Sequence, residues 1–229
     1  MFNLEQYNNL IKRLVDIGLK PTTDWNEKLD ANSLLLRHDI DFSIEYAYQL
    51  ARAENKLKIC STFFFMITSN LYNLLSEHNQ KLVNEIADMG HKISIHYDPT
   101  AHEGLEEFAY EKNIFEKIFK VKVDIVSIHR PGSFLDNNNI LISGISQTYQ
   151  DIYYKKMKYI SDSAGRNIFP PISEYLEGPR DLGLHLLIHP IWWIGTGNNP
   201  KEKLNDWSNK KFNFISSEIR KNTKKIYED

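Results

Sequence analysis

Short apolar runs alternate with amphipathic stretches along most of this chain. Six of the runs have the length and composition of buried strands: "SLLLRHD", "CSTFFFMI", "KISIHYD", "VDIVSIHRP", "MKYISDS" and "LHLLIHPIWW". The amphipathic stretches predict helices over 4–17, 43–56, 71–89 and 104–119. Such alternation indicates parallel strands with helices outside them. An open α/β sheet and a (β/α) barrel both fit this pattern.

The last part of the chain carries one more amphipathic stretch. Leu204, Trp207, Ile215 and Ile219 recur at helical spacing, so we expect a final helix that packs back onto the rest of the protein. The chain has 229 residues, which suits one large domain or two small ones, and it contains no internal repeat and no Pro/Gly/Ser-rich linker. We therefore expect residues 1–229 to form a single domain.

The composition argues against several classes of protein. The formal net charge is −2, which gives no electrostatic basis for binding nucleic acid. The single cysteine, Cys60, rules out an intrachain disulfide. No window approaches the ~20 apolar residues of a membrane span, and the first residues are typical of an amphipathic helix rather than a signal peptide. We therefore expect a cytoplasmic protein, and the sequence leaves its oligomeric state open.

Polar residues gather where the predicted strands end. Five of the six runs are followed by His, Asp or Arg: Arg37, His38, Asp39 and Asp41; His96 and Asp98; His129 and Arg130; Asp162; and His189. In parallel α/β folds all strand C-termini lie on one face, so these side chains should converge there. Singly, each could be a helix cap, a turn residue or a satisfied core histidine. Five occurrences on one face predict a functional cluster.

The residue types in this cluster suit a metal ion. Imidazoles and carboxylates together are the ligand set of Zn²⁺ and of Fe, Co or Ni. A metal with an open coordination position activates water and polarises a carbonyl, and a spare carboxylate or histidine can serve as base or acid. The cluster contains no thiol, and the chain has neither a G-x-S-x-G elbow nor a P-loop. These residues therefore favour metal-assisted hydrolysis.

Six short motifs resemble those of the polysaccharide deacetylases, the NodB-homology or carbohydrate esterase 4 family. The motifs are "LRHDID", "STFFF", "GHKISIHYD", "SIHRP", "YISDS" and "LLIHP"; they occur in the family's order and span about residues 33–190. They are most similar to a divergent branch with H-D-x-D at the first strand, often found among surface-polysaccharide genes. The resemblance implies a distorted (β/α) barrel of about seven parallel strands, here with flanking N- and C-terminal helices. It also implies a divalent metal held by Asp-His-His.

The first motif of the family supplies a catalytic base and a metal ligand. The family carries two adjacent acids, whereas this chain has Asp39 and Asp41 with Ile40 between them. Residues two apart share one face of a strand, so both acids can point into the site. The resemblance implies Asp39 as the base and Asp41 as the ligand, and the reverse assignment is the alternative.

The second motif departs from the family's pattern. His96 matches the first histidine of a pair spaced four residues apart and is implied as a metal ligand, but Thr100 stands where the second histidine belongs. His129 is the expected third ligand, with His102, Asp98 or water as alternatives.

The third motif, R-x-P, orients the base in the family. If Pro131 is aligned with its proline, His129 stands at the arginine position and Arg130 lies one residue off. Arg130 is therefore the arginine that this motif assigns to the base.

The last two motifs concern the general acid. Asp162 matches the start of D-x-x-x-W, in which the Asp tunes the catalytic histidine, but Arg166 stands at the Trp position. His189 in "LLIHP" is implied as the acid that protonates the leaving amine, oriented by Asp162. Trp192 and Trp193 either wall the site for an acetyl methyl group or a sugar face, or only pack in the core or at the rim.

The implied function is metal-dependent hydrolysis of an N-acetyl or O-acetyl group on a sugar or glycan precursor, in surface-polysaccharide biosynthesis. Zn²⁺ is the first choice of metal, with Co, Ni or Fe as alternatives. A cytoplasmic substrate would be a nucleotide-linked sugar or a lipid-linked glycan precursor. One competing hypothesis is a C–N hydrolase acting on a non-sugar amide. Another is a catalytically silent carbohydrate-binding or scaffold domain, which the missing His and Trp keep open.

Overall fold

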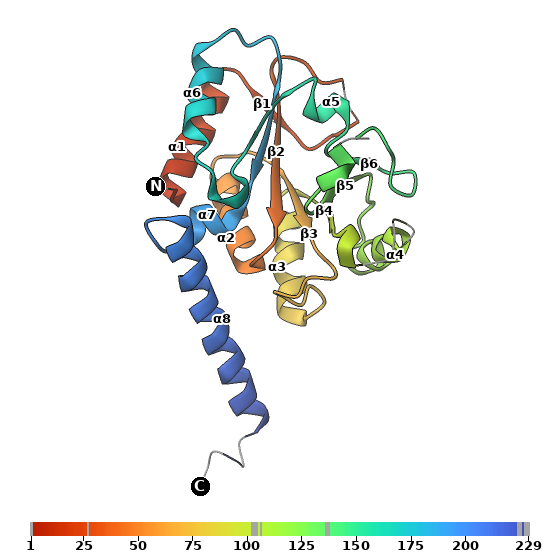
Figure 1. The fold of residues 1–229 in the computed structure, drawn as a ribbon, viewed down its shortest axis with the longest axis vertical. Coiled ribbons are helices and arrows are strands. Elements are labelled where there is room, and N and C mark those ends of the chain that lie inside the picture. Colours follow the sequence, from red (N-terminus) through yellow and green to blue (C-terminus); the bar gives the residue numbers. More distant parts are fainter. Residues whose placement is uncertain are drawn as a thin grey trace.

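One curled sheet forms the centre of the computed structural model, which describes residues 2–26, 28–101, 105, 107–135, 138–223 and 226 (Figure 1). The described strands run in the order β6-β5-β4-β3-β2-β8-β7, and β1 lies alongside the first half of β2. Every one of these pairings is parallel. Because β6 and β7 end the path without pairing to each other, the sheet is a half-closed barrel, and the predicted distorted (β/α) barrel is confirmed.

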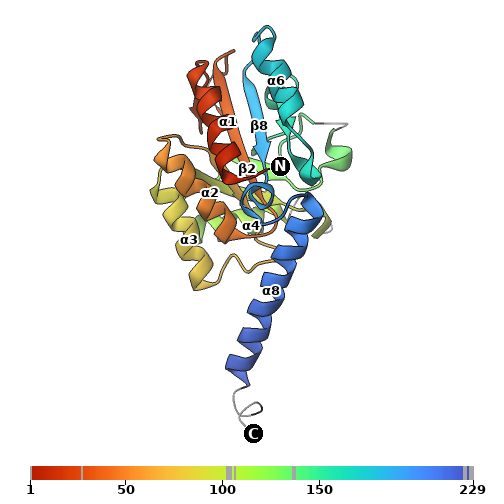
Figure 2. The same cartoon turned by 90° about the vertical axis from the view of Figure 1, so that its left-hand side faces the viewer.

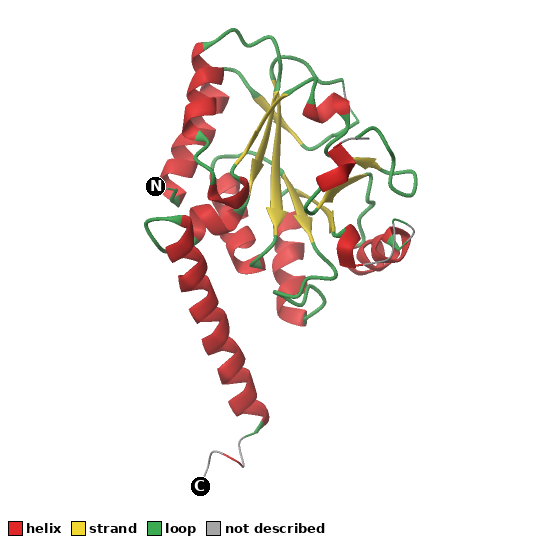
Figure 3. Cartoon of the chain, viewed as in Figure 1, coloured by secondary structure: helices red, strands yellow, loops and turns green. Residues whose placement is uncertain are grey.

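Helices surround the strands, as Figure 3 shows by colour. The strands are β1 (Lys20–Thr22), β2 (Ser33–Ile40), β3 (Thr62–Phe65), β4 (Lys92–Tyr97), β5 (Ile125–Ile128), β6 (Ser146–Gln147), β7 (Lys158–Ser161) and β8 (Leu184–Ile188). The helices are α1 (Leu4–Asp16), α2 (Ile44–Lys56), α3 (Glu77–Asp88), α4 (Phe108–Phe119), α5 (Asp151–Tyr154), α6 (Phe169–Glu177), α7 (Pro190–Ile194) and α8 (Pro200–Asn222). Short 3-10 turns occupy Pro99–Ala101, Gly132–Leu135 and Ser163–Gly165. All six predicted strands are present.

The central strand β2 is buried on both faces of the sheet. Its even-numbered residues, such as Leu34 and Leu36, pack against the surrounding helices. On the opposite, concave face, Leu35 packs with Phe64 and Trp25 near the start of the strand. Successive strand residues alternate between faces, so the following odd-numbered positions also point into the concave side. Those positions carry the charged residues of the first motif, "LRHDID". The alternation therefore brings these charged side chains together on the concave side of the sheet.

Two predicted helices begin later than their apolar pattern suggests. α3 begins at Glu77 instead of residue 71, because Ser76 is its N-cap and accepts a hydrogen bond from the Asn79 amide. The preceding Asn73 accepts one from the Leu75 amide at 3.0 Å and holds a turn there. α4 begins at Phe108, and most of 102–106 lies outside the described residues. The strands β1 and β6 were not predicted, because segments of three and two residues are too short to show periodicity.

The last helix, α8, packs back only in its first half. Leu204 and Trp207 contact the apolar core between α1, α2 and β8. Further along, Ile215 and Ile219 are exposed, and the helix leads away from the rest of the molecule (Figures 1 and 2). The prediction that the whole stretch packs back is therefore wrong for its second half. Within the described part of the chain, no helix is both long enough and apolar enough to cross a membrane.

A buried histidine on the concave face should make folding stability depend on pH. His185 in β8 is fully buried, and its Nδ1 donates to the Tyr153 carbonyl at 3.0 Å. Burial, reinforced by the positive charge of Arg37, lowers the pKa of His185 to about 3. An unfolded chain protonates histidine near pH ~6.5. The unfolded state therefore binds this proton more readily at intermediate pH, so the stability is full above about pH 6.5 and is lost as the pH falls towards about 3.

We expect the free energy of unfolding to fall by about 3–5 kcal/mol across that range through this residue alone. Urea titrations at several pH values measure this fall. In His185→Leu the free energy of unfolding should depend less on pH over the same range. The exposed His78 provides the control variant, His78→Gln. If the free energy of unfolding falls as steeply with decreasing pH in His185→Leu as in the wild type, His185 is not the cause of the pH dependence.

Candidate active site

A pocket of about 810 Å³ lies where the strands end. Asp39 in β2 and His96 in β4 line it. The residues just after four strands line it as well: Asp41 after β2, Asp98 after β4, His129 and Arg130 after β5, and His189 after β8. The predicted convergence of the strand ends is therefore confirmed. His38 does not take part: it points to the other face, where its Nε2 lies 2.7 Å from Glu54 Oε1.

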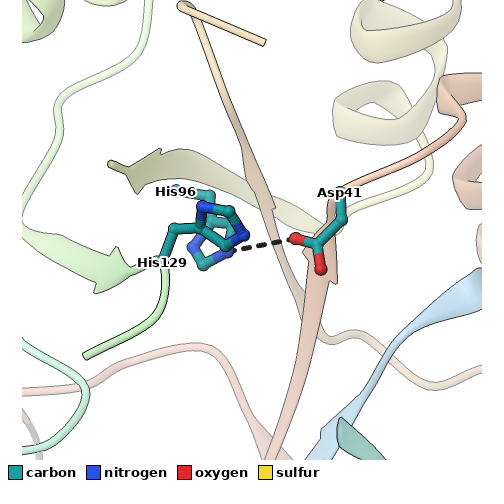
Figure 4. Close-up of side chains that lie close together, drawn as sticks. All are labelled: Asp41, His96 and His129. Atoms are coloured by element: carbon teal, nitrogen blue, oxygen red, sulfur yellow. Dashed lines mark ion pairs between the residues drawn. The ribbon is translucent and has the colours of Figure 1, made fainter. Parts of the chain in front are cut away.

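Asp41, His96 and His129 form a compact group in this pocket (Figure 4). One potential ligand atom from each residue lies within 4.8 Å of the other two. Asp41 Oδ1 is 3.2 Å from His96 Nε2, and the two imidazole rings are 5.1 Å apart in an edge-on arrangement. One carboxylate and two imidazoles leave coordination positions open for water and substrate, as catalytic metal sites do.

A carboxylate behind His129 fixes the orientation of its ring. His129 Nδ1 lies 2.9 Å from Asp98 Oδ2, so Nδ1 carries the proton and Nε2 presents its lone pair to the group. Thr100 in turn donates to Asp98 Oδ1 from its amide at 2.9 Å and from its hydroxyl at 2.7 Å. Burial would raise the pKa of Asp98, but these hydrogen bonds and His129 hold it below its usual value. Thr100, where the family has a histidine, thus supports His129 through Asp98.

A buried serine orients His96 in the same way. Ser127 stands beside His96 in the register of β4 and β5, and its Oγ is 2.9 Å from His96 Nδ1. The same Oγ lies 3.1 Å from both carboxylate oxygens of Asp39. Because the hydroxyl has a single proton, donating it to Asp39 leaves Ser127 to accept from His96 Nδ1–H. His96 Nε2 then turns its lone pair towards Asp41.

The surroundings of Asp41 fit a divalent cation. Its Oδ1 is buried and has no hydrogen-bond partner among the described residues. Burial would raise the pKa of Asp41, but the nearby His96 and His189 lower it, so the carboxylate is ionised. An ionised oxygen that faces an imidazole lone pair in a buried site is costly unless a cation lies between them. Carboxylate and imidazole donors are the set that Zn²⁺ and related metals take.

Asp39 is held by an arginine from its own strand. Arg37 is fully buried and donates from Nε to Asp39 Oδ1 at 2.8 Å and from Nη2 to Asp39 Oδ2 at 2.6 Å. Burial would raise the pKa of Asp39, but the Arg37 guanidinium and His96 hold it well below its usual range. Arg37 also contacts Ser127 Oγ at 2.5 Å and stacks over the Tyr149 ring, 4.8 Å from its centroid. The Asp39 carboxylate is therefore ionised and held in place by Arg37.

His189 lines the pocket and is held by an aspartate behind it. Its Nδ1 is 2.6 Å from Asp162 Oδ1, and its amide also donates to that carboxylate. Burial would lower the pKa of His189, but Asp162 and then Asp41 raise it to about 9. Trp193 Nε1 donates to Asp162 Oδ2 at 2.8 Å. His189 is therefore protonated at neutral pH, with Nε2 3.7 Å from Asp41 Oδ2.

The remaining predicted residues are Arg130, the two tryptophans and His102. Arg130 is exposed at the pocket rim and makes no ion pair with Asp39 among the described residues, because Arg37 already occupies both oxygens. Of the two tryptophans, Trp192 lines the pocket and Trp193 holds Asp162. The alternative ligand His102 lies outside the described residues.

Sequence reasoning did not assign the supporting roles of three residues: Arg37, Ser127 and Trp193. Arg37 was visible as the charged residue two positions before Asp39 on a strand, a spacing that puts both on one face. Ser127 and Trp193 gave no such signal, because their contacts depend on strand register and on the short helix α7.

Solved structures similar to this chain include deacetylases, carbohydrate esterases and a family 4 pseudoenzyme from Bacillus anthracis. A variant of the peptidoglycan deacetylase PdaC from Bacillus subtilis is 14% identical over 90% of this chain and 100% of its own, with a TM-score of 0.49. A family 4 acetyl xylan esterase from Clostridium thermocellum, in complex with a cobalt ion, is 11% identical over 77% and 82%, with a TM-score of 0.44. No protein-family model and no curated protein matches the sequence. At such identities the likeness concerns the fold alone, so the roles below rest on this chain's own residues.

Proposed function

We propose that this chain is a metal-dependent deacetylase that hydrolyses an N-acetyl or O-acetyl group on a sugar or glycan precursor. The observation that carries the proposal is one pocket holding an Asp-His-His group, an arginine-held carboxylate and a protonated histidine backed by Asp162. That combination provides a metal position, a base and an acid, which are the parts that hydrolysis of an acetamide needs.

The metal would be held by Asp41, His96 and His129, with Zn²⁺ as first choice and Co, Ni or Fe as alternatives. When bound, it supplies a water of lowered pKa and polarises the acetyl carbonyl. Asp39 would accept a proton from the attacking water, since it is ionised and fixed by Arg37. His189 gives its Nε2 proton to the leaving amine or alcohol, while Asp162 holds the other ring nitrogen.

Metal removal tests the proposal. The purified protein, supplied with Zn²⁺ or Co²⁺, should bind about one ion per chain and release acetate from acetylated sugars such as N-acetylglucosamine oligomers, UDP-N-acetylglucosamine and acetylated xylo-oligosaccharides. Stripping the ion with dipicolinate should lower acetate release about 100-fold or more, and adding Zn²⁺ should restore it. Acetate is measured by an enzyme-coupled assay and the metal by mass spectrometry.

The competing hypotheses give different results in the same experiment. A protein that binds no stoichiometric metal and releases no acetate would indicate the silent carbohydrate-binding or scaffold domain. A protein that binds metal and hydrolyses simple acetamides, but no acetylated sugar, would indicate a C–N hydrolase on a non-sugar amide.

A further inference from the structure

Two arginines lie at this site, in opposite environments. Arg37 is fully buried and bound to Asp39 through two nitrogens. Arg130 is exposed and lines the rim of the pocket. The family motif assigns the base-holding role to the arginine of the "HRP" segment, so Arg130 is the residue whose role the structure leaves open.

The charge of Arg130 is not used by any carboxylate of the pocket. Two of those carboxylates have their own partners: Asp39 has Arg37, and Asp98 has His129 and Thr100. The third, Asp41, belongs to the Asp-His-His group. Asp162, buried behind His189, is bound by His189 and Trp193. Within the described residues, Arg130 forms no ion pair and no side-chain hydrogen bond. A guanidinium therefore stands at the pocket mouth with its donors free.

The backbone of Arg130 is held in an uncommon conformation. Its φ is +50°, in the left-handed region that non-glycine residues seldom adopt, and it precedes Pro131. Such strain costs on the order of 1–3 kcal/mol and persists where the surrounding structure fixes it, often at ligand sites. Arg130 directly follows His129 in the chain, and both residues line the same pocket. A ligand that fills the pocket can therefore contact Arg130 and the Asp-His-His group together.

We propose that Arg37 is the positioning residue for Asp39, and that Arg130 instead binds a phosphate carried by the substrate. The inference rests on the proposed function. It names the substrate class as an acetylated amino sugar with a phosphate at the ring carbon next to the acetamide, as in a 2-acetamido sugar 1-phosphate or diphosphate. The planar guanidinium presents paired N–H donors that match phosphate oxygens. A phosphate and an acetamide on neighbouring ring carbons can reach Arg130 and the Asp-His-His group at the same time, since both line one pocket.

Ligand binding to the zinc-loaded full chain tests the role of Arg130 without requiring turnover. Calorimetry with N-acetylglucosamine 1-phosphate and with neutral N-acetylglucosamine should show about tenfold or tighter binding of the phosphate form. Arg130→Gln should remove this difference, and Arg130→Lys should keep part of it. Inorganic phosphate is titrated alongside, to measure binding to the zinc itself. Equal binding of both sugars by the wild type, no binding of either, or a preference that survives Arg130→Gln would overturn the inference.

Further probes separate the possible sources of the phosphate. Tighter binding of UDP-N-acetylglucosamine than of the 1-phosphate would indicate a nucleotide-linked sugar. Tighter binding of a short-chain prenyl-diphospho-N-acetylglucosamine would indicate a lipid-linked one. If Arg130 is needed to bind N-acetylmuramic acid but gives no preference for phosphate sugars, its ligand is a carboxylate. That result would contradict the proposed substrate class.

Steady-state kinetics test the role of Arg37. Arg37→Lys keeps the charge but loses the two-point contact, so kcat should fall about 100-fold with KM and the phosphate preference unchanged. Arg130→Gln should instead raise KM for the phosphate sugar about tenfold or more. If Arg37→Lys does not fold, Tyr149→Phe replaces it, since Tyr149 OH lies 3.2 Å from Arg37 Nη2. That variant should lower kcat alone, by about threefold to tenfold.

The opposite split, with Arg130→Gln lowering kcat and neither Arg37→Lys nor Tyr149→Phe doing so, would return the base-holding role to Arg130. If the wild type binds the phosphate sugar through Arg130 but releases no acetate, the proposed hydrolysis fails and this binding role stands. Acetate release with no preference for phosphate overturns the inference and leaves the proposed function intact.

Discussion

Replacing Asp39 with asparagine is expected to lower kcat by about 10²–10⁴-fold and to leave the metal content unchanged. Asparagine keeps the size of the side chain, and its single oxygen can still accept a hydrogen bond from Arg37. Its NH2 group cannot accept the second one, and the amide cannot take a proton from water. Asp39 lies outside the Asp-His-His group, so the metal position remains complete. Acetate release at saturating substrate, together with metal analysis of the same preparation, measures both quantities.

Asp41→Asn is the matched comparison, because the two acids are two residues apart on one strand face. It should lose metal as well as activity, since its Oδ1 is the buried oxygen without a hydrogen-bond partner. If Asp39→Asn loses the metal while Asp41→Asn retains it, the base and ligand assignments are reversed. If Asp39→Asn keeps full activity, Asp39 is not the base.

The order of elements in this fold was predictable from the sequence because it depends on local patterns. Six runs of apolar residues predicted six strands, and the alternation of these strands with helices predicted that they are parallel. The ends of the elements were less predictable. For example, the apolar pattern before α3 starts earlier, but Ser76 caps the helix and sets where it begins. The free half of α8 has the same helical periodicity as the packed half, so only the tertiary structure separates Trp207 from Ile219.

The positions of the site residues followed from topology. Parallel strands end on one face, and that rule predicted that Asp41, His96 and His129 share a site, whereas the resemblance to the deacetylase family singled them out as ligands. The partners of these residues were harder to predict. Ser127 reaches His96 through the register of two neighbouring strands, which the sequence does not state. The family motif also predicted that Arg130 holds Asp39. In the structure Asp39 is held instead by Arg37, two residues earlier in β2.

Replacing His129 with glutamine is expected to lower metal affinity by about 100-fold or more and to abolish acetate release without unfolding the chain. His129 is the residue that would compensate for Thr100, and its Nε2 is free because Asp98 holds Nδ1. Glutamine offers a weak oxygen ligand in place of an imidazole nitrogen, so the Asp-His-His group would retain only two strong donors. Competition titrations with a zinc chelator measure the affinity, and thermal unfolding of the metal-free protein measures the fold.

Two further variants separate a ligand from its support. Asp98→Asn weakens the hydrogen bond behind His129 without removing a proposed ligand, so zinc affinity should fall by a smaller factor, about 10-fold to 100-fold. His102→Gln, at the alternative ligand position, should leave the affinity within about threefold of the wild type, because removing a group that does not bind the metal costs little. If His102→Gln loses the metal and His129→Gln keeps it, the third ligand is His102. Asp98 then loses its supporting role, since an imidazole that holds no metal needs no fixed tautomer.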